Sequence, residues 1–204
     1  MASSSVMLDY WKKPKRRKVV APAPGLMTVN DYFSNTPRRL SPAELIYGAM
    51  RLADAPVPRH QSAVACLFRA LDRHVREHAL GRVWLAPLDV VLSERDALIV
   101  QPDLFFVSND RAWIVRDRVR GAPDLVIEVL SPHPRIGQTR ERVGWFRDYG
   151  VRECWLVHQD TGSITVIEYA DRTISRTASF KRGETLVSTV LPDFITSLDQ
   201  ILFE

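Results

Sequence analysis

The segment between residues 60 and 80 has the clearest pattern of hydrophobic and polar positions in the chain. Charged residues occupy one side of it, and hydrophobic residues recur three and four positions apart on the other. These hydrophobic positions are Val64, Leu67, Phe68, Leu71 and Val75. The spacing predicts the main amphipathic helix of the protein, and Gly81 is expected to end it as a C-cap.

Hydrophobic runs of strand length follow this helix, separated by turn-forming residues. They are RVWLAP, DVVLS, ALIVQPDLFFVS, PDLVIEVLS, ECWLVHQ and SITVIEYA, and after residue 170 come TISRTASF and TLVSTV. Residues 28–35, capped by Thr28, and residues 139–149, ended by Gly150, predict further helices, and residues 197–203 predict a terminal helical turn. This order of helices and strands indicates α/β or α+β organisation.

One segment, LSPAELIYGAMRLA at residues 40–53, fits two structures. Ser41, Pro42 and Glu44 form a capping box, which predicts a helix. Gly48 interrupts that pattern, and the two halves around it could equally pair as a short hairpin. Local rules leave both interpretations open.

The composition is that of one folded domain. The chain has 204 residues, of which 46% are hydrophobic and 25% charged, which is enough for one sizeable core. No hydrophobic run approaches the roughly 18 residues that span a bilayer, and the N-terminus lacks the order of a secretory signal. We therefore expect a cytoplasmic protein. Cys66 and Cys154 lie in hydrophobic patterns without a metal-binding spacing, and we interpret both as reduced core thiols.

The net charge of +4 comes from the N-terminus. Its first 18 residues hold one acidic residue and six basic ones, whereas the rest of the chain holds 22 basic and 23 acidic residues. The basic residues are Lys12, Lys13, Lys15, Arg16, Arg17 and Lys18. Such a cluster can contact nucleic-acid phosphates, act as a nuclear address or be merely solvated. The two prolines and the glycine of APAPG, residues 21–25, interrupt regular structure. They predict a disordered basic tail and Pro-rich linker over residues 1–26 and one domain over residues 27–204.

Two acidic residues fall within runs that predict buried strands, Asp103 in IVQPDLFFV and Glu128 in PDLVIEV. Burying an isolated ionised carboxylate is costly, and strands that carry one often serve metal binding or acid–base chemistry. Placed on neighbouring strands, Asp103 and Glu128 would form an all-oxygen site with the carbonyl of Val129, which suits Mg²⁺ or Mn²⁺. Asp124 shares the strand face of Glu128, but after a proline it is equally suited to satisfy loop amides.

Several motifs in this order carry a family resemblance. The motifs GRVWLAPLDVVL, VQPDLFFV, RGAPDLVIEVLSP and RERVGWFRDYGVRECWLV resemble those of the Uma-type putative restriction endonuclease family, a branch of the PD-(D/E)xK nuclease superfamily. The resemblance runs from about Met27 to the C-terminus. It implies an α/β restriction-endonuclease-like fold, a central mixed β-sheet flanked by helices, with Asp103 and Glu128 as metal ligands. It also favours the hairpin for the segment around Gly48.

The resemblance implies further site residues and shows three departures. Glu44 and His60 stand where the family usually has an acidic residue and a histidine. The family's lysine position on the following helix is Arg142 here, while Gln138 and Tyr47 stand where the family commonly has Asp. Arginine can stabilise phosphate charge, but its high pKa prevents it from acting readily as a general base.

These observations predict a divalent-metal-dependent DNA endonuclease. Asp103 and Glu128 would hold Mg²⁺ or Mn²⁺, and Arg142 would stabilise charge on the phosphorus. DNA is the expected partner, a membrane is not, and a homodimer is left open. One alternative is a catalytically weakened nuclease-fold protein that binds nucleic acid or a protein partner. Another is a carboxylate-dependent hydrolase of a different substrate.

Overall fold

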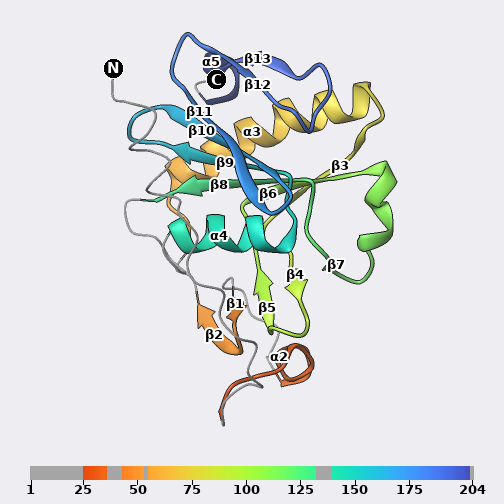
Figure 1. Ribbon diagram of the computed structural model, residues 1–204. Coiled ribbons are helices and arrows are strands. Elements are labelled where there is room, and N and C mark those ends of the chain that lie inside the picture. Colours follow the sequence, from red (N-terminus) through yellow and green to blue (C-terminus); the bar gives the residue numbers. More distant parts are fainter. Residues whose placement is uncertain (1–24, 36–42, 53–54, 132–138, 203–204) are drawn as a thin grey trace.

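The structure, a computed structural model, describes residues 25–35, 43–52, 55–131 and 139–202. Its largest sheet has six strands in the order β11-β10-β9-β8-β6-β3 (Figure 1). Strands β8 and β9 run parallel and every other neighbouring pair in this sheet is antiparallel, so the predicted mixed sheet is confirmed. The strands are β3 (Gly81–Leu85), β6 (Leu104–Ser108), β8 (Leu125–Leu130), β9 (Glu153–His158), β10 (Ser163–Ala170) and β11 (Thr173–Phe180).

A second sheet has five strands in the order β2-β1-β5-β4-β7. The predicted run ALIVQPDLFFVS supplies one strand to each sheet, because the chain passes from the smaller to the larger sheet at Pro102 and Asp103. Asp103 therefore lies in a bend before β6, not within a strand as predicted. The strands are β1 (Ala43–Ile46), β2 (Ala49–Leu52), β4 (Val90–Ser93), β5 (Leu98–Val100) and β7 (Val119–Arg120).

The ambiguous segment around Gly48 is a hairpin. Strands β1 and β2 pair with Ala43 opposite Leu52, and Tyr47 and Gly48 form the turn with φ of 51° and 85°. Two successive positive φ angles are typical of the tight turns that join antiparallel strands. The helix predicted from the capping box is therefore wrong over the described part of this segment.

Two helices cover opposite faces of the six-stranded sheet (Figure 1). Helix α3 (Pro58–Glu77) packs Leu67 and Leu71 on the face that carries Leu125 and Ile127. Helix α4 (Thr139–Tyr149) packs Val143 and Phe146, both predicted to face inward, on the other side. Because strand side chains alternate, Val126 of β8 faces α4 while its neighbours face α3.

Helix α3 ends earlier than the sequence indicates. It finishes at Glu77, and Ala79 takes the left-handed φ of 50° that was expected of Gly81. Gly81 begins β3, where a Cβ atom would lie 2.2 Å from the carbonyl oxygen of Val107. The glycine therefore permits close approach of β3 and β6 and does not cap the helix.

The C-terminal elements cover α3 and one end of the core. They are β12 (Thr185–Val187), β13 (Ile195–Ser197) and α5 (Leu198–Leu202). The fully buried carboxylate of Glu153 accepts hydrogen bonds from Ser188 Oγ at 2.7 Å, from Thr189 N at 2.8 Å and from Trp155 Nε1 at 2.6 Å. A buried carboxylate needs such donors, so this cluster fixes the C-terminal segment on β9.

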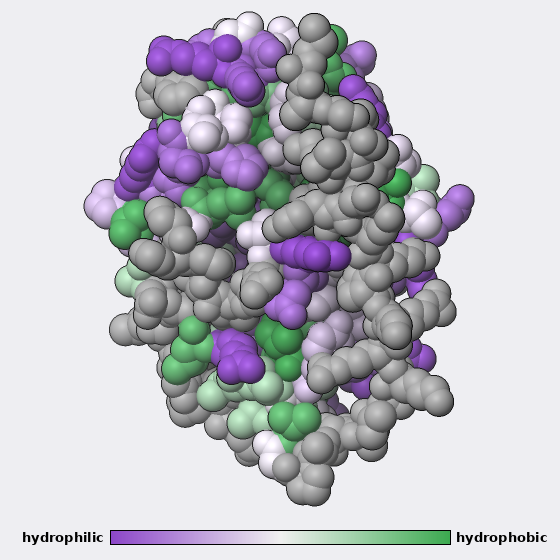
Figure 2. All heavy atoms as spheres, turned by 60° about the vertical axis from the view of Figure 1, so that its left-hand side comes forward, coloured by the Kyte–Doolittle hydropathy of each residue, from purple (hydrophilic) through white to green (hydrophobic). Residues whose placement is uncertain are grey.

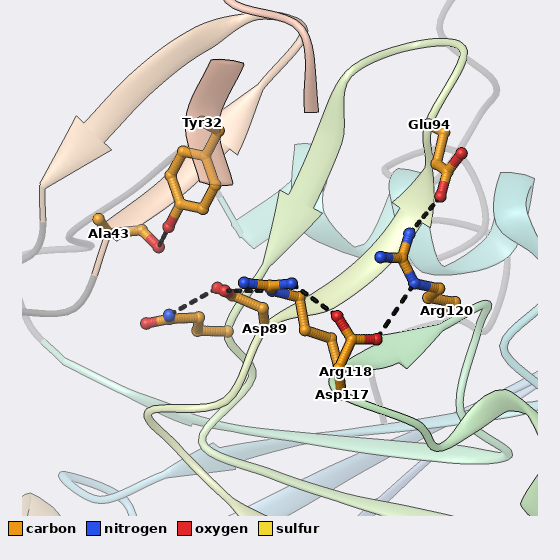
Figure 3. A network of polar contacts seen from close by, with 8 residues as sticks. Tyr32, Ala43, Asp89, Glu94, Asp117, Arg118 and Arg120 are labelled. Carbon is orange, nitrogen blue, oxygen red and sulfur yellow. Dashed lines mark hydrogen bonds and ion pairs between the residues drawn. The ribbon is translucent and has the colours of Figure 1, made fainter. Parts of the chain in front are cut away.

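A network of ion pairs links two strands of the smaller sheet. Acidic and basic groups alternate from Asp89 through Arg118, Asp117 and Arg120 to Glu94 (Figure 3). These residues lie in or next to β4 and β7, so the ion pairs join the two strands.

The same network reaches helix α2 (Val29–Asn35), because the guanidinium carbon of Arg118 lies 3.4 Å from the ring centroid of Phe33. Thr28 caps α2 as predicted, since its Oγ1 accepts the N–H of Asp31 at 3.1 Å. The 3₁₀ helix η1 (Asn109–Ile114) follows β6.

The molecular surface shows small hydrophobic areas interspersed with hydrophilic ones on the face seen in Figure 2. Cys66 and Cys154 are buried thiols, as predicted. In the described ranges, no helix is long and apolar enough to cross a membrane. The division between a tail and a domain near residue 26 stays a prediction, because residues 1–24 lie outside the described part of the chain.

Candidate active site

Glu44 and Glu128 belong to different sheets and face the same helix. In β1, Leu45 packs in the cluster beneath α2, so the strand period of two turns Glu44 the other way. In β8, Ile127 faces α3, and the same alternation turns Glu128 toward α4. Strand periodicity therefore directs both carboxylates into the space beside α4.

Arg142, near the start of α4, bridges these two carboxylates. Its Nη1 donates to Glu44 Oε2 at 2.7 Å, its Nη2 donates to Glu128 Oε1 at 2.7 Å, and its Nε donates to the same Glu128 oxygen at 3.2 Å. The side chains of Glu44, Arg142 and Glu128 are only 4%, 11% and 12% exposed. One buried guanidinium thus connects a strand of each sheet with the helix between them.

Asp103 reaches the same place from the bend before β6. Leu104 of β6 pairs with Ile127 of β8, and continuing this antiparallel register places Asp103 beside Glu128. Asp103 Oδ2 accepts the backbone N–H of Val129 at 2.8 Å and lies 3.2 Å from Nε2 of His60, in the first turn of α3. Asp103 is thereby held by both β8 and α3.

The hydrogen bonds of His60 indicate its tautomer. Its Nδ1 is buried and has no partner among the described residues, whereas Nε2 faces the Asp103 carboxylate. A buried N–H without an acceptor costs more than an unused ring lone pair, so we assign the proton to Nε2. His60 then acts as a hydrogen-bond donor to Asp103.

Negative charge exceeds positive charge in the cluster. Burial raises the pKa of Glu128 to about 8; the Arg142 guanidinium opposes this shift, while the nearby charges of Asp103 and Glu44 add to it. Burial works against the charged guanidinium, but Glu128 and Glu44 raise the pKa of Arg142 above its already high ordinary value. Arg142 therefore stays charged at all physiological pH values.

Gln101 is a supporting residue that the sequence pattern did not single out. Its backbone N–H donates to Glu44 Oε1 at 2.7 Å, and its side-chain Nε2 donates to Asp89 Oδ1 at 2.8 Å. Burial raises the pKa of Asp89, although the Gln101 hydrogen bond and Arg118 oppose this. Gln101 stands in the QPD motif. Its contact with Glu44 could not be predicted from the residue type, because any residue other than proline has the backbone N–H that makes it. The Asp89–Arg118 network of Figure 3 is thus connected to the candidate site.

The structure brings together five of the residues that the sequence singled out: Glu44, His60, Asp103, Glu128 and Arg142. Asp124 is elsewhere, because its Oδ2 accepts the N–H of Ser108 at 2.9 Å and its Oδ1 pairs with Arg111 at 3.2 Å. The expected amide contact is present, but its donor is the last residue of β6, and the other partners of Asp124 are the guanidinium groups of Arg111 and Arg152. Gln138 and the basic residues of the tail lie outside the described residues.

The described residues contain no cluster of three or more His, Cys, Asp or Glu side chains arranged to hold a metal ion. The metal roles of Asp103, Glu128 and the Val129 carbonyl therefore stay predictions. The two carboxylates do lie side by side, and Asp103 contacts the residue that follows Glu128.

The model of the Uma2 family, described as putative restriction endonuclease, matches residues 31–199. The chain belongs to the Uma2 family. Its structure is similar to the crystal structure of a protein from Anabaena variabilis described as a putative nuclease belonging to DUF820. The TM-score is 0.71 at 18% sequence identity, over 86% of this chain and 97% of that chain. No curated protein matches the sequence.

This Uma2 protein has the restriction-endonuclease-like fold that the sequence resemblance implied. The mixed sheet lies between α3 and α4, and the bend at Asp103, where the chain leaves the smaller sheet, lies beside Glu128 of the interior strand β8. The residues carried over from the family motifs are the ones that meet there. At this level of identity the structural likeness concerns the fold alone.

The raised pKa of Glu128 predicts a pH dependence of stability. Between its ordinary value of 4.5 and about 8, the folded protein holds a proton that the unfolded chain has lost. The free energy of unfolding should therefore fall as pH rises through this window, by up to about 1.4 kcal/mol per pH unit. Glu128→Gln should remove this contribution. Urea unfolding of both proteins at about pH 5.5 and about pH 7.5 measures the difference, and parallel pH dependences would contradict the prediction.

Proposed function

We propose that this protein is a divalent-metal-dependent endonuclease that hydrolyses phosphodiester bonds in DNA. The observation that carries the proposal is the placement of Asp103 beside Glu128, together with the Arg142 guanidinium that bridges Glu128 to Glu44. Membership of a family described as putative restriction endonuclease supports DNA as the substrate. The fold alone would not distinguish this activity from others.

The donor set fits a hard divalent cation. Asp103, Glu128 and the Val129 carbonyl offer oxygen atoms only, which favours Mg²⁺ or Mn²⁺ over zinc. Burial and the neighbouring carboxylates of Asp103 and Glu44 raise the pKa of Glu128. The single positive charge of Arg142 therefore does not neutralise all the acidic groups of the cluster. When bound, such an ion lowers the pKa of water and stabilises charge on a phosphate. A cation beside Asp103 and Glu128 would also lower the pKa of Glu128.

The chain's own residues prepare this site in three ways. The Val129 N–H and His60 hold Asp103 Oδ2, which fixes the orientation of the carboxylate. The N–H of Gln101 holds Glu44. Arg142 supplies permanent positive charge beside Glu128, and in this proposal that charge stabilises the phosphate as negative charge develops on it.

Contacts to the DNA backbone are assigned to the basic tail, Lys12, Lys13, Lys15, Arg16, Arg17 and Lys18. This assignment rests on the sequence alone, because the tail lies outside the described residues. A cytoplasmic location is part of the same proposal.

A second candidate function has a specific observation in its favour. Arg142 replaces the lysine of the family pattern and donates three hydrogen bonds to carboxylates. Such a guanidinium cannot readily accept a proton from water, because its pKa is too high. A protein with this fold and little catalytic activity would instead bind nucleic acid or a protein partner. The two functions differ in turnover and in their response to substitution at Arg142.

Asp103→Asn and Glu128→Gln test the metal assignment. Each change removes a ligand charge with little change in volume, so each should lower Mn²⁺ affinity and plasmid cleavage by at least about 100-fold. Calorimetric titration with Mn²⁺ and cleavage of supercoiled plasmid, with and without chelator, are the measurements. Glu94→Gln, at an exposed acid on the smaller sheet, serves as the control. Unchanged Mn²⁺ binding in both ligand variants would eliminate the proposed site.

Arg142→Lys separates the two candidate functions. A lysine amine has a lower pKa than a guanidinium and can exchange a proton with water, so cleavage should rise by about tenfold or more. Arg142→Ala should cleave less than the wild type. Single-turnover cleavage of supercoiled plasmid is the assay. Undiminished cleavage by Arg142→Ala would rule out the role given to Arg142, and no cleavage by any variant would favour the binding protein.

A further inference from the structure

We propose that Arg142 restricts this site to a single divalent cation, because its guanidinium serves as the second positive group of the acidic cluster. The inference rests on the proposed function, since it concerns the same carboxylates. It differs from that function in assigning the number of ions and in excluding Glu44 as a ligand. It is specific to this chain, because it depends on an arginine where the family pattern has lysine.

The hydrogen bonds of Glu44 are the first argument. Its Oε2 accepts Arg142 Nη1 at 2.7 Å, and its Oε1 accepts the backbone N–H of Gln101 at 2.7 Å. Both oxygens are therefore engaged by donors, and the side chain is only 4% exposed. Each oxygen keeps a lone pair, but a cation bound there would lie against the charged Arg142 guanidinium and be repelled by it. Glu44 thus neutralises Arg142 and does not extend the metal site.

The hydrogen bonds of Glu128 are the second argument. Two-metal sites place their ions about 3.5–4 Å apart and need shared acidic ligands between them. Here Glu128 Oε1 accepts two N–H groups of Arg142, at 2.7 and 3.2 Å. The Arg142 guanidinium therefore occupies the space between Glu128 and Glu44, where a second ion would have to bind. The side toward Asp103 keeps a pair of carboxylates for one ion.

The position of Arg142 also resists displacement. Its side chain is 11% exposed, its guanidinium carbon lies 5.9 Å from the ring centroid of Phe146, and its own helix packs on the sheet. If the guanidinium moved into solvent, Glu44 and Glu128 would be left buried without their positive partner. Removing one partner of a buried ion pair is strongly unfavourable. A second cation would have to overcome that cost as well as its own dehydration.

The experiment counts Mn²⁺ ions bound to the full chain by calorimetry, with electron paramagnetic resonance to detect magnetic coupling between neighbouring ions. The wild type should bind one ion without coupling. Arg142→Gln should bind two, with a coupled signal, because Glu44 and the second side of Glu128 lose their guanidinium. Glu44→Gln should still bind one ion, with a dissociation constant raised by less than about tenfold through the loss of a nearby negative charge. Arg140→Gln, at an exposed arginine of the same helix, is the matched control and should behave as wild type.

Each outcome bears on the inference. Two ions in the wild type would overturn it while supporting a metal-dependent function, and no bound ion in the wild type would overturn both. A single ion of wild-type affinity in Arg142→Gln would also overturn it. Should Arg142→Gln fail to fold, Glu44→Gln decides: a tenfold or greater loss of Mn²⁺ affinity would make Glu44 a ligand and contradict the inference, whereas retained binding supports it.

Discussion

A guanidinium buried between two carboxylates is stable only when both of these partners are in place. Arg142 on α4 pairs with Glu44 of the five-stranded sheet and Glu128 of the six-stranded sheet, with both short contacts at 2.7 Å. Burying Arg142 with its two acidic partners is compensated only when the geometry is good and the remaining donors and acceptors are satisfied. The hairpin β1–β2, strand β8 and helix α4 must therefore take their observed places together.

The other contacts of the site hold this arrangement in register. The chain crosses between the two sheets at Pro102 and Asp103, so residues next to the crossing touch both. Gln101, on one side, donates to Glu44 through its backbone. Asp103, on the other side, accepts from Val129 of β8. A short crossing with contacts in both directions leaves little freedom in the separation of Glu44, Asp103 and Glu128, which is the preorganisation that a metal or phosphate site requires.

Much of this could be predicted because it depends on local periodicity. The spacing of Leu67 and Leu71 predicts α3, and the strand period places Glu128 on the face opposite Ile127. What the sequence did not predict depends on contacts between distant segments. Glu44 and Arg142 are 98 positions apart, and nothing in either segment indicates their pairing. Gly81 serves strand packing and not a helix cap because Val107 lies directly against it. Asp103 was expected within a strand, since the break between two sheets is not visible in a continuous hydrophobic run.

The most direct test of the bridge is the coupling energy between Glu44 and Arg142, measured with a double-mutant cycle of Glu44→Gln and Arg142→Gln by urea unfolding. Arg142→Gln alone should cost about 3–5 kcal/mol, because it leaves buried carboxylates without their positive partner. The double variant should be less destabilised than the sum of the single variants by about 1–3 kcal/mol. Effects that add to within about 0.5 kcal/mol would contradict a buried Glu44–Arg142 contact as the interaction that joins the two sheets.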